Sequence, residues 1–204
     1  MENFLDLLVD GGPLMIPILL CSVIALGVFL ERVFYLRRKK IIPSELVIKV
    51  EELVKEGRIN DVTSILRRDR SPMARIFLAA VKNFGKKREV IKESVEEVGG
   101  QEAEYLEKYV GVLSVIAQIS PLLGLLGTVQ GMIKVFNKIM SVGVGDPSQL
   151  ADGISVALVT TAAGLTVAIP TLIGYHYLIG RASDLTSEMQ LYTISLVDII
   201  KGED

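Results

Sequence analysis

The polar side chains that could act chemically inside the apolar parts of this sequence are small hydroxyls. Thr128 stands in one apolar stretch, and Ser155, Thr160, Thr161 and Thr166 stand in a later one. A hydroxyl can both donate a hydrogen bond to a carboxyl group and accept one from it. Counted from the ends of their stretches at 1.5 Å per residue, Thr128 and Thr161 lie at similar depths, roughly 8 to 12 Å inside. In antiparallel neighbouring helices they could form one polar ring.

Helix packing is the alternative role for these hydroxyls, because Ser and Thr in membrane helices also bond to their own helix or join two helices. The small residues around them fit packing. Gly127 and Gly131 form a GxxxG pair, which lets helices approach closely. The residues alone leave pore lining and packing open. The helix-packing candidates are Gly127, Gly131, Ala157, Gly164 and Ala168, and the candidates for helix bends are Pro121 and Pro170.

Carboxylates are absent from all three apolar stretches. The stretch Val110–Ile133 has no ionisable side chain, Pro13–Leu30 has only Cys21, and Gly153–Gly180 has only Tyr175, His176 and Tyr177. Ion paths through membranes are usually marked by buried charged residues. If this chain conducts protons, another subunit must therefore bring the titrating group.

Composition excludes several functional classes. The chain has 204 residues and is 50% hydrophobic, and its net charge of -2 gives no footprint for nucleic acid. One Cys and one His are too few for a disulfide framework or a metal site. No nucleophile or acid–base pair stands in the apolar stretches, so we expect no catalytic residue, no enzyme activity and no cofactor.

The apolar stretches are long enough to cross a bilayer, which takes about 20 residues of helix. We therefore predict an all-α membrane protein with three transmembrane helices and a helical cytoplasmic domain. The predicted order is an outer N-terminus (1–12), a first span (13–36), a cytoplasmic helical segment (37–109), a second span (110–136), a short outer loop (137–152), a third span (153–180) and a cytoplasmic C-terminal helix (181–204).

The distribution of cations predicts the orientation. Of the 22 Lys and Arg residues, 17 lie between Arg37 and Lys108, and none precedes the first span. By the positive-inside rule the long connection is cytoplasmic, the N-terminus is outside and the C-terminus is inside. Arg37-Arg38-Lys39-Lys40 follows the first span as a stop-transfer flank, which argues against a cleaved signal peptide.

The cytoplasmic segment has the pattern of short amphipathic helices. Pro43-Ser44 opens one, Asn60 could cap a second, and Ser71-Pro72 is a good start for a third. From Arg88 to Lys108 the pattern is charged and helical, and this helix could run straight into the second span.

Three stretches resemble the MotA/TolQ/ExbB proton-channel family. They are Gly11–Ser22 followed by Leu30-Glu31-Arg32, then Pro121–Met132, and finally Gly153–Leu165 with Ala168-Ile169-Pro170. Their order and loop sizes are similar to those of the family, so the resemblance covers nearly the whole chain. The short outer loop and the chain length look closer to ExbB and TolQ than to flagellar stator proteins.

The resemblance implies a homopentamer in the bacterial inner membrane, with the second and third spans around a central pore. Single-span partners of the ExbD/TolR type sit in such pores, and a membrane aspartate of the partner carries the proton. Thr128 and Thr161 match the family's pore-lining threonines, and Ser155 and Thr160 are further pore or packing candidates. The implied function is the pore-forming subunit of a motor driven by the proton-motive force. The alternative is a non-conducting membrane scaffold.

One position departs from the family pattern. In ExbB and TolQ a glutamate usually stands where this sequence has Val156. The role of that glutamate therefore cannot be carried over to this chain.

Overall fold

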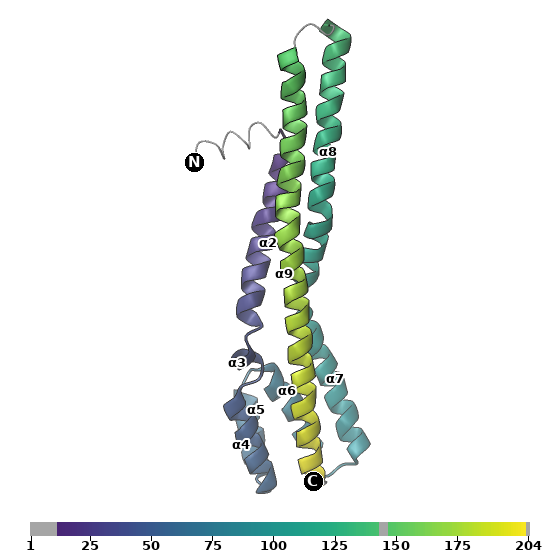
Figure 1. Cartoon of the computed structure of the whole chain (residues 1–204). Helices are drawn as coiled ribbons and strands as arrows, with labels where there is room; N and C mark the ends of the chain where they lie inside the picture. The colour runs from purple at the N-terminus through teal and green to yellow at the C-terminus, as the bar shows by residue number, and fades with distance from the viewer. Residues whose placement is uncertain (1–11, 143–146, 203–204) are drawn as a thin grey trace. The chain divides into compact units, whose positions relative to one another are not determined.

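A computed structural model describes residues 12–142 and 147–202, and this part of the chain is helical with no strand (Figure 1). Two helices are much longer than the others because the apolar stretches continue into polar helical sequence. The helices are α2 (Met15–Tyr35), α3 (Arg38–Ile41), α4 (Ser44–Lys55), α5 (Ile59–Arg68), α6 (Pro72–Lys82), α7 (Arg88–Glu107), α8 (Val110–Val142) and α9 (Pro147–Lys201).

The chain divides into two compact units. The apolar unit consists of Met1–Leu30 and Tyr109–His176, and the charged unit of Glu31–Lys108 and Tyr177–Asp204. Helices α2 and α9 contribute to both. Each unit is described separately below.

Three helices are long and apolar enough to cross a membrane, as predicted. The most apolar part of the helix Met15–Tyr35 has a mean hydropathy of 2.1. The corresponding values are 1.9 for the helical stretch that ends at Ser141 and 2.0 for the one that begins at Gly153. Many large apolar side chains on these helices are exposed, Leu122 and Ile173 among them. Lipid or another polypeptide can therefore cover these surfaces.

The helices extend beyond the predicted spans. Helix α8 continues to Val142 and α9 begins at Pro147, so both enter the segment 137–152 that was predicted as an outer loop. A span predicted from hydropathy ends at the first polar residues, whereas a helix ends where its backbone hydrogen bonds end. The predicted third span and C-terminal helix are likewise one continuous helix, α9. Residues 1–11 of the predicted outer N-terminus lie outside the described residues.

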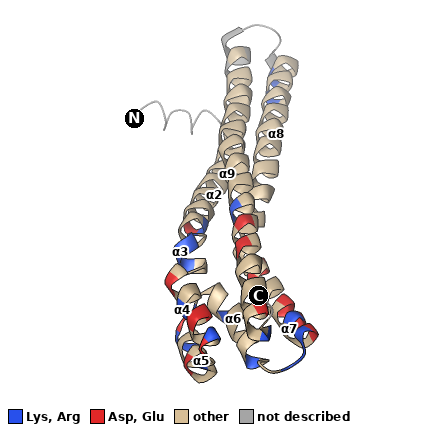
Figure 2. Ribbon diagram, turned by 60° about the horizontal axis from the view of Figure 1, so that its bottom comes forward, with Lys and Arg blue, Asp and Glu red and all other residues tan. Residues whose placement is uncertain are grey.

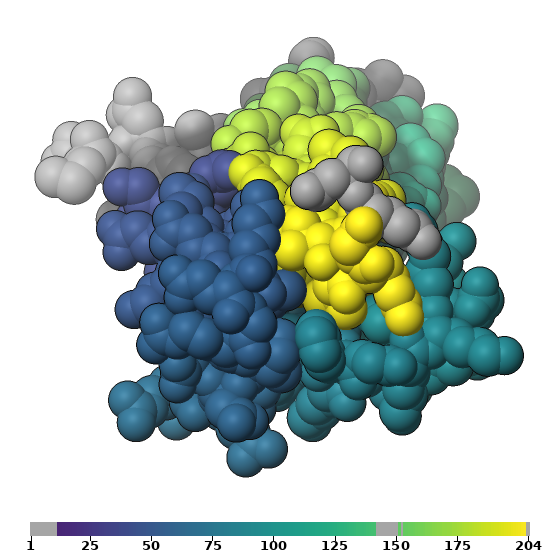
Figure 3. Space-filling view, turned by 90° about the horizontal axis from the view of Figure 1, so that it is seen from below, coloured from purple at the N-terminus to yellow at the C-terminus, as the bar shows by residue number. Residues whose placement is uncertain are grey.

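The charged unit has its own core. Its helices α4 to α6 turn their apolar sides inward, with Val50, Val62 and Phe77 fully buried. Ser71 caps α6 as the sequence predicts, because its hydroxyl accepts a hydrogen bond from the Ala74 amide at 3.2 Å. Seen from below in Figure 3, the C-terminal end of α9 (yellow) lies between the surface of α4 and α5 (blue) and that of α7 (teal).

Two predictions about helix boundaries were wrong. Asn60 does not cap α5, because Gly57 adopts a positive φ of 73° and the Arg58 amide bonds back to the Leu53 carbonyl, so that α5 starts immediately at Ile59. Helix α7 does not run into α8 either. The backbone turns at Tyr109, whose φ is 66°. This break leaves the cation of Lys108 at the C-terminal end of α7, where the helix dipole favours positive charge.

Candidate functional site

The apolar unit is built on a close antiparallel contact between α8 and α9, which run side by side in Figure 1. Glycines set its register. A Cβ added to Gly127 would lie 2.4 Å from Thr160 Cγ2, and one added to Gly131 would lie 2.8 Å from Ala157 Cβ. Only glycine fits at these points, so the small residues fix how deeply α9 packs against α8.

The same contact continues toward the other end of the two helices. A Cβ added to Gly164 would lie 2.5 Å from the carbonyl oxygen of Ser120. Ala157 and Ala168 are buried, at 3% and 5% exposed. The structure thus places Gly127, Gly131, Ala157 and Gly164 in one helix–helix contact.

Thr161 joins the two helices by a hydrogen bond. Its hydroxyl donates to the carbonyl oxygen of Gly124 at 3.0 Å. A carbonyl has no hydrogen, so the threonine must be the donor. The oxygen of Thr161 is therefore left with lone pairs that can only accept.

Thr128 bonds within its own helix. Its hydroxyl donates to the Leu125 carbonyl at 2.6 Å, and its side chain is half-buried. The carbonyls that accept the hydrogen bonds of Thr161 and Thr128 belong to consecutive residues of α8, Gly124 and Leu125, which differ in height by about 1.5 Å along the helix axis. The two hydroxyls therefore lie within one turn of each other along α8. This geometry agrees with the similar depth expected from the sequence, while the pore-lining role of the two threonines stays a prediction.

The two additional hydroxyl candidates have different surroundings. Thr160 is fully buried against Gly127, and its hydroxyl donates to the Val156 carbonyl at 2.8 Å. Ser155 is exposed. Of these two, only Ser155 presents its side chain at the surface of the described chain.

The two candidates for helix bends lie inside helices that continue on both sides. Pro121 is in α8 and Pro170 is in α9. Neither can donate a backbone hydrogen bond, which leaves the carbonyls of Ala117 and Thr166 without their usual partner in the helix. That the helices bend or hinge at these points stays a prediction.

Several important residues were missed by sequence reasoning. Gly124 supplies the acceptor for Thr161, and a Cβ on Gly153 would lie 2.4 Å from Cγ2 of Val135. The spacing of Gly124, Gly127 and Gly131 was a usable signal for packing. Every residue has a backbone carbonyl, so the residue types do not indicate that the carbonyl of Gly124 accepts this hydrogen bond.

The contact between α8 and α9 contains neutral polar groups. Within the described residues, no group of three or more His, Cys, Asp or Glu side chains could hold a metal ion. His176 is exposed and lies edge-on to the ring of Tyr175, with ring centres 5.1 Å apart. The contact between α8 and α9 thus offers neutral hydroxyl and carbonyl oxygens.

The charged unit carries the strong ion pairs. Arg38 of α3 is held by Glu188 of α9, and Arg75 of α6 is held by Glu102 of α7. The hydrogen bonds that the two guanidinium groups donate to these carboxylates raise the pKa of both arginines above the ordinary value. Both guanidinium groups are therefore charged at every physiological pH.

Comparison with known proteins defines the class. Residues 68–191 match the MotA/TolQ/ExbB proton channel family. The chain is 33% identical over 189 residues to the "Putative biopolymer transport protein ExbB-like 1" of Synechocystis sp., covering 89% of this chain and 72% of that protein. It is 29% identical to the "Putative biopolymer transport protein ExbB homolog" of Methanothermobacter thermautotrophicus, covering 92% and 67%.

A TolQ protein is also similar. The "Tol-Pal system protein TolQ" of Haemophilus influenzae is 30% identical over 124 residues, covering 55% of this chain and 54% of that protein. The described residues are helical, three of the helices are able to span a membrane, and the family match covers most of the chain, which together define a membrane protein of energy transduction. The chain belongs to the MotA/TolQ/ExbB proton channel family, an inner-membrane transport family rather than a family of enzymes.

Proposed function

We propose that this protein is the pore-forming subunit of a motor driven by the proton-motive force. In this proposal five copies surround a central pore lined by α8 and α9. A single-span partner of the ExbD/TolR type supplies the acid that carries the proton. The observation that carries the proposal is that the apolar stretches contain hydroxyl groups but no carboxylate. The stretch Val110–Ile133, for example, contains Thr128 but no ionisable side chain.

The hydrogen bonds of the two threonines support a preference for a protonated acid. Thr128 and Thr161 both donate to backbone carbonyls, and they therefore offer only acceptor lone pairs to a ligand. A neutral carboxylic acid can donate its proton to such an oxygen. An ionised carboxylate can bind only if the threonine hydroxyl first breaks its hydrogen bond to the backbone carbonyl. Protonation of the partner's aspartate would thus decide whether it docks.

The energies are compatible with this cycle. Exchanging one hydrogen bond costs about 0.5 to 1.5 kcal/mol net. One charge crossing 100 mV supplies about 2.3 kcal/mol. A single proton can therefore drive the release and recapture of the acid at one threonine.

Proton flux through the reconstituted complex tests the proposal. We expect Thr128→Val and Thr161→Val to lower flux by about tenfold or more, which corresponds to the loss of about 1.4 kcal/mol per step. Thr161→Ser keeps the hydroxyl and should keep flux. Thr166→Val is the matched control, because Thr166 is exposed and bonds only to Ala162 of its own helix. Unchanged flux in both valine variants would overturn the pore assignment.

Gentle extraction from the membrane tests the partner independently. A pentamer that co-purifies with a single-span protein bearing a membrane aspartate is the expected result. A stable assembly that conducts ions with no acidic partner helix contradicts the proposal. A stable assembly that neither conducts nor retains such a helix indicates the alternative, a membrane scaffold.

A further inference from the structure

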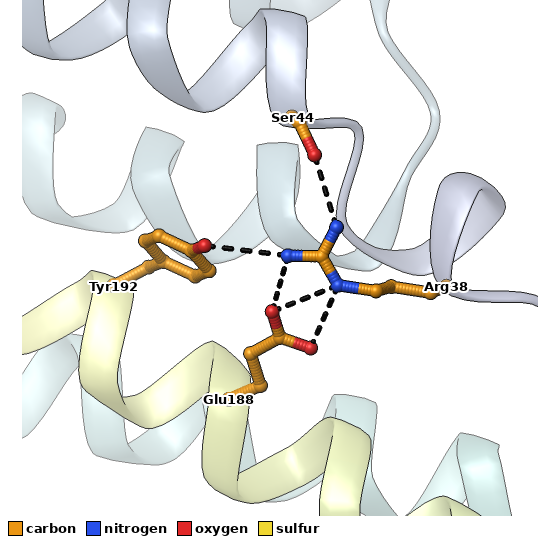
Figure 4. A network of polar contacts seen from close by, with 4 residues as sticks. All are labelled: Arg38, Ser44, Glu188 and Tyr192. Atoms are coloured by element: carbon orange, nitrogen blue, oxygen red, sulfur yellow. Dashed lines mark hydrogen bonds and ion pairs between the residues drawn. The ribbon is translucent and has the colours of Figure 1, made fainter.

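The sequence Arg37-Arg38-Lys39-Lys40 directly follows α2, and the structure divides these four cations into two groups. Arg38 points inward, where Glu188, Ser44 and Tyr192 surround its guanidinium group (Figure 4). Its Nε donates to the two carboxylate oxygens of Glu188 at 2.9 and 3.0 Å. This arginine is part of the fold of the charged unit.

The other three cations take no part in that network. Arg37, Lys39 and Lys40 are exposed. Ile41 and Ile42, which follow them, are 1% and 0% exposed. This short segment thus has a buried side, made by Arg38 and the two isoleucines, and an exposed side that is basic. Figure 2 shows the Lys and Arg residues of α3 as a blue stretch of ribbon.

Nearby acids do not neutralise this basic side. Glu188 is bound to Arg38, and Glu31 pairs with Arg32 at 2.7 Å. Among the described residues, Lys39 and Lys40 have no ion pair or side-chain hydrogen bond. The positive charge of the outward side is therefore available to a ligand.

An apolar surface adjoins the cations. Phe34 lies in the last turn of α2 and is 51% exposed. The guanidinium carbon of Arg37 lies 4.6 Å from the centre of the Phe34 ring. Because α2 is long and apolar enough to span a membrane, its end lies where acyl chains give way to headgroups. A ligand for this place must have an apolar part beside Phe34 and a negative part beside the cations.

We infer that Phe34, Arg37, Lys39 and Lys40 form a binding site for the headgroup of an anionic phospholipid. The Arg38–Glu188 pair positions the site by tying α3 to α9. Clusters of Lys and Arg next to a membrane helix attract anionic headgroups by about 1 kcal/mol per cation. Three cations therefore correspond to a preference on the order of 100-fold for an anionic over a zwitterionic lipid. This site is separate from the proposed pore.

Lipid retention by the full chain in neutral detergent tests the inference. Native mass spectrometry would compare phosphatidylglycerol with phosphatidylcholine. We expect R37Q/K39Q/K40Q to lose on the order of 100-fold in affinity for phosphatidylglycerol and to bind phosphatidylcholine as before. The charge-matched control is R67Q/R68Q/R70Q, which removes three exposed cations of the same unit and should bind as the wild type does.

Further measurements separate the possible causes. If the triple variant does not fold by circular dichroism, the single variants K39Q and K40Q replace it, each with an expected loss of about 5-fold. Inorganic phosphate should not displace the lipid, and Phe34→Ala should weaken phosphatidylglycerol but not its acyl-free headgroup, glycerophosphoglycerol. Equal affinity in wild type and triple variant, an equal loss in the control, or displacement by inorganic phosphate would overturn the assignment.

Discussion

Thr161 and Gly124 are joined by a hydrogen bond of 3.0 Å that runs from a side chain of α9 to a backbone carbonyl of α8. The bond restricts the rotation of both helices at a point where Gly124 brings their backbones close together. It also fixes which atoms of Thr161 remain available to a ligand. Packing and pore lining, which the residue types leave as alternatives, are therefore compatible in this one side chain.

The first prediction concerns the strength of this bond. Thr161→Val keeps the shape of the side chain and removes the donor, and we expect it to lower stability in detergent by about 0.6 to 1.7 kcal/mol. Thr161→Ser keeps the donor and should lose less. Thermal unfolding followed by circular dichroism measures both. A valine variant as stable as the wild type would mean that the bond contributes nothing to the fold.

The second prediction concerns the contact between Gly153 and Val135. A Cβ on Gly153 would meet Val135 Cγ2 at 2.4 Å, while its next neighbours are 3.7 and 3.8 Å away. Valine is stiff at χ1, so it cannot easily move aside. We expect Gly153→Ala to cost about 1 to 3 kcal/mol.

A double-mutant cycle makes this prediction specific. Val135→Ala alone should cost about 1 to 2 kcal/mol, because it deletes buried methyl groups. In the double variant the new methyl group fills the space that valine leaves, so the two losses should fall short of additivity by at least about 1 kcal/mol. Gly27→Ala is the control, since nothing lies within 4 Å of the added Cβ. Strictly additive losses would contradict the observed register.

Much of this architecture could be predicted from the sequence. Three apolar helices follow from hydropathy, and the start of α6 at Ser71-Pro72 follows from capping chemistry. The family follows from motifs that are long and specific. In each of these cases the cause is local, or it repeats along the chain.

The rest depends on contacts between distant residues or on backbone geometry. The hydrogen bond from Thr161 to the Gly124 carbonyl depends on a register that glycine contacts between two helices set, and the break at Tyr109 is a backbone conformation that its residue type does not favour. The pairing of Arg38 with Glu188 joins residues 150 positions apart. Residue types and local spacing do not specify such partners.

The third prediction concerns the ion pair of Arg75 and Glu102 in the charged unit. The Glu102 side chain is only 6% exposed, whereas that of Arg75 is 44% exposed. Arg75→Met leaves a buried carboxylate without its partner, a change that costs about 3 to 5 kcal/mol for fully buried pairs. Because solvent screens the exposed arginine, we expect a smaller loss of about 1 to 3 kcal/mol.

The pH dependence of this pair and a matched control complete the third prediction. Glu102 raises the pKa of Arg75, so on the alkaline side the pair keeps its full stabilising effect up to the ordinary arginine pKa and loses it only as pH rises through the raised value. The difference between wild type and Arg75→Met should therefore stay constant from about pH 7 to pH 10. Arg58→Met is the control, because Arg58 and its partners are all more than half exposed, and we expect no measurable change. A loss in the control as large as that in Arg75→Met would mean that burial of Glu102 is not the cause.

The fourth prediction concerns Ser120, which stands just before Pro121 where α8 meets α9. Ser120 is 0% exposed, and within the described part of the chain its hydroxyl has no hydrogen-bond partner. A buried polar group without a partner costs about 1 to 3 kcal/mol, and alanine fills nearly the same space. Ser120→Ala should therefore leave stability unchanged or raise it by up to about 2 kcal/mol in thermal unfolding. Ser114→Ala is the control, because the Ser114 hydroxyl accepts a bond from Gln118 at 3.0 Å and its removal should bring no gain. If Ser120→Ala instead destabilises the purified protein by more than about 1 kcal/mol, the Ser120 hydroxyl has a hydrogen-bond partner that forms only when chains assemble.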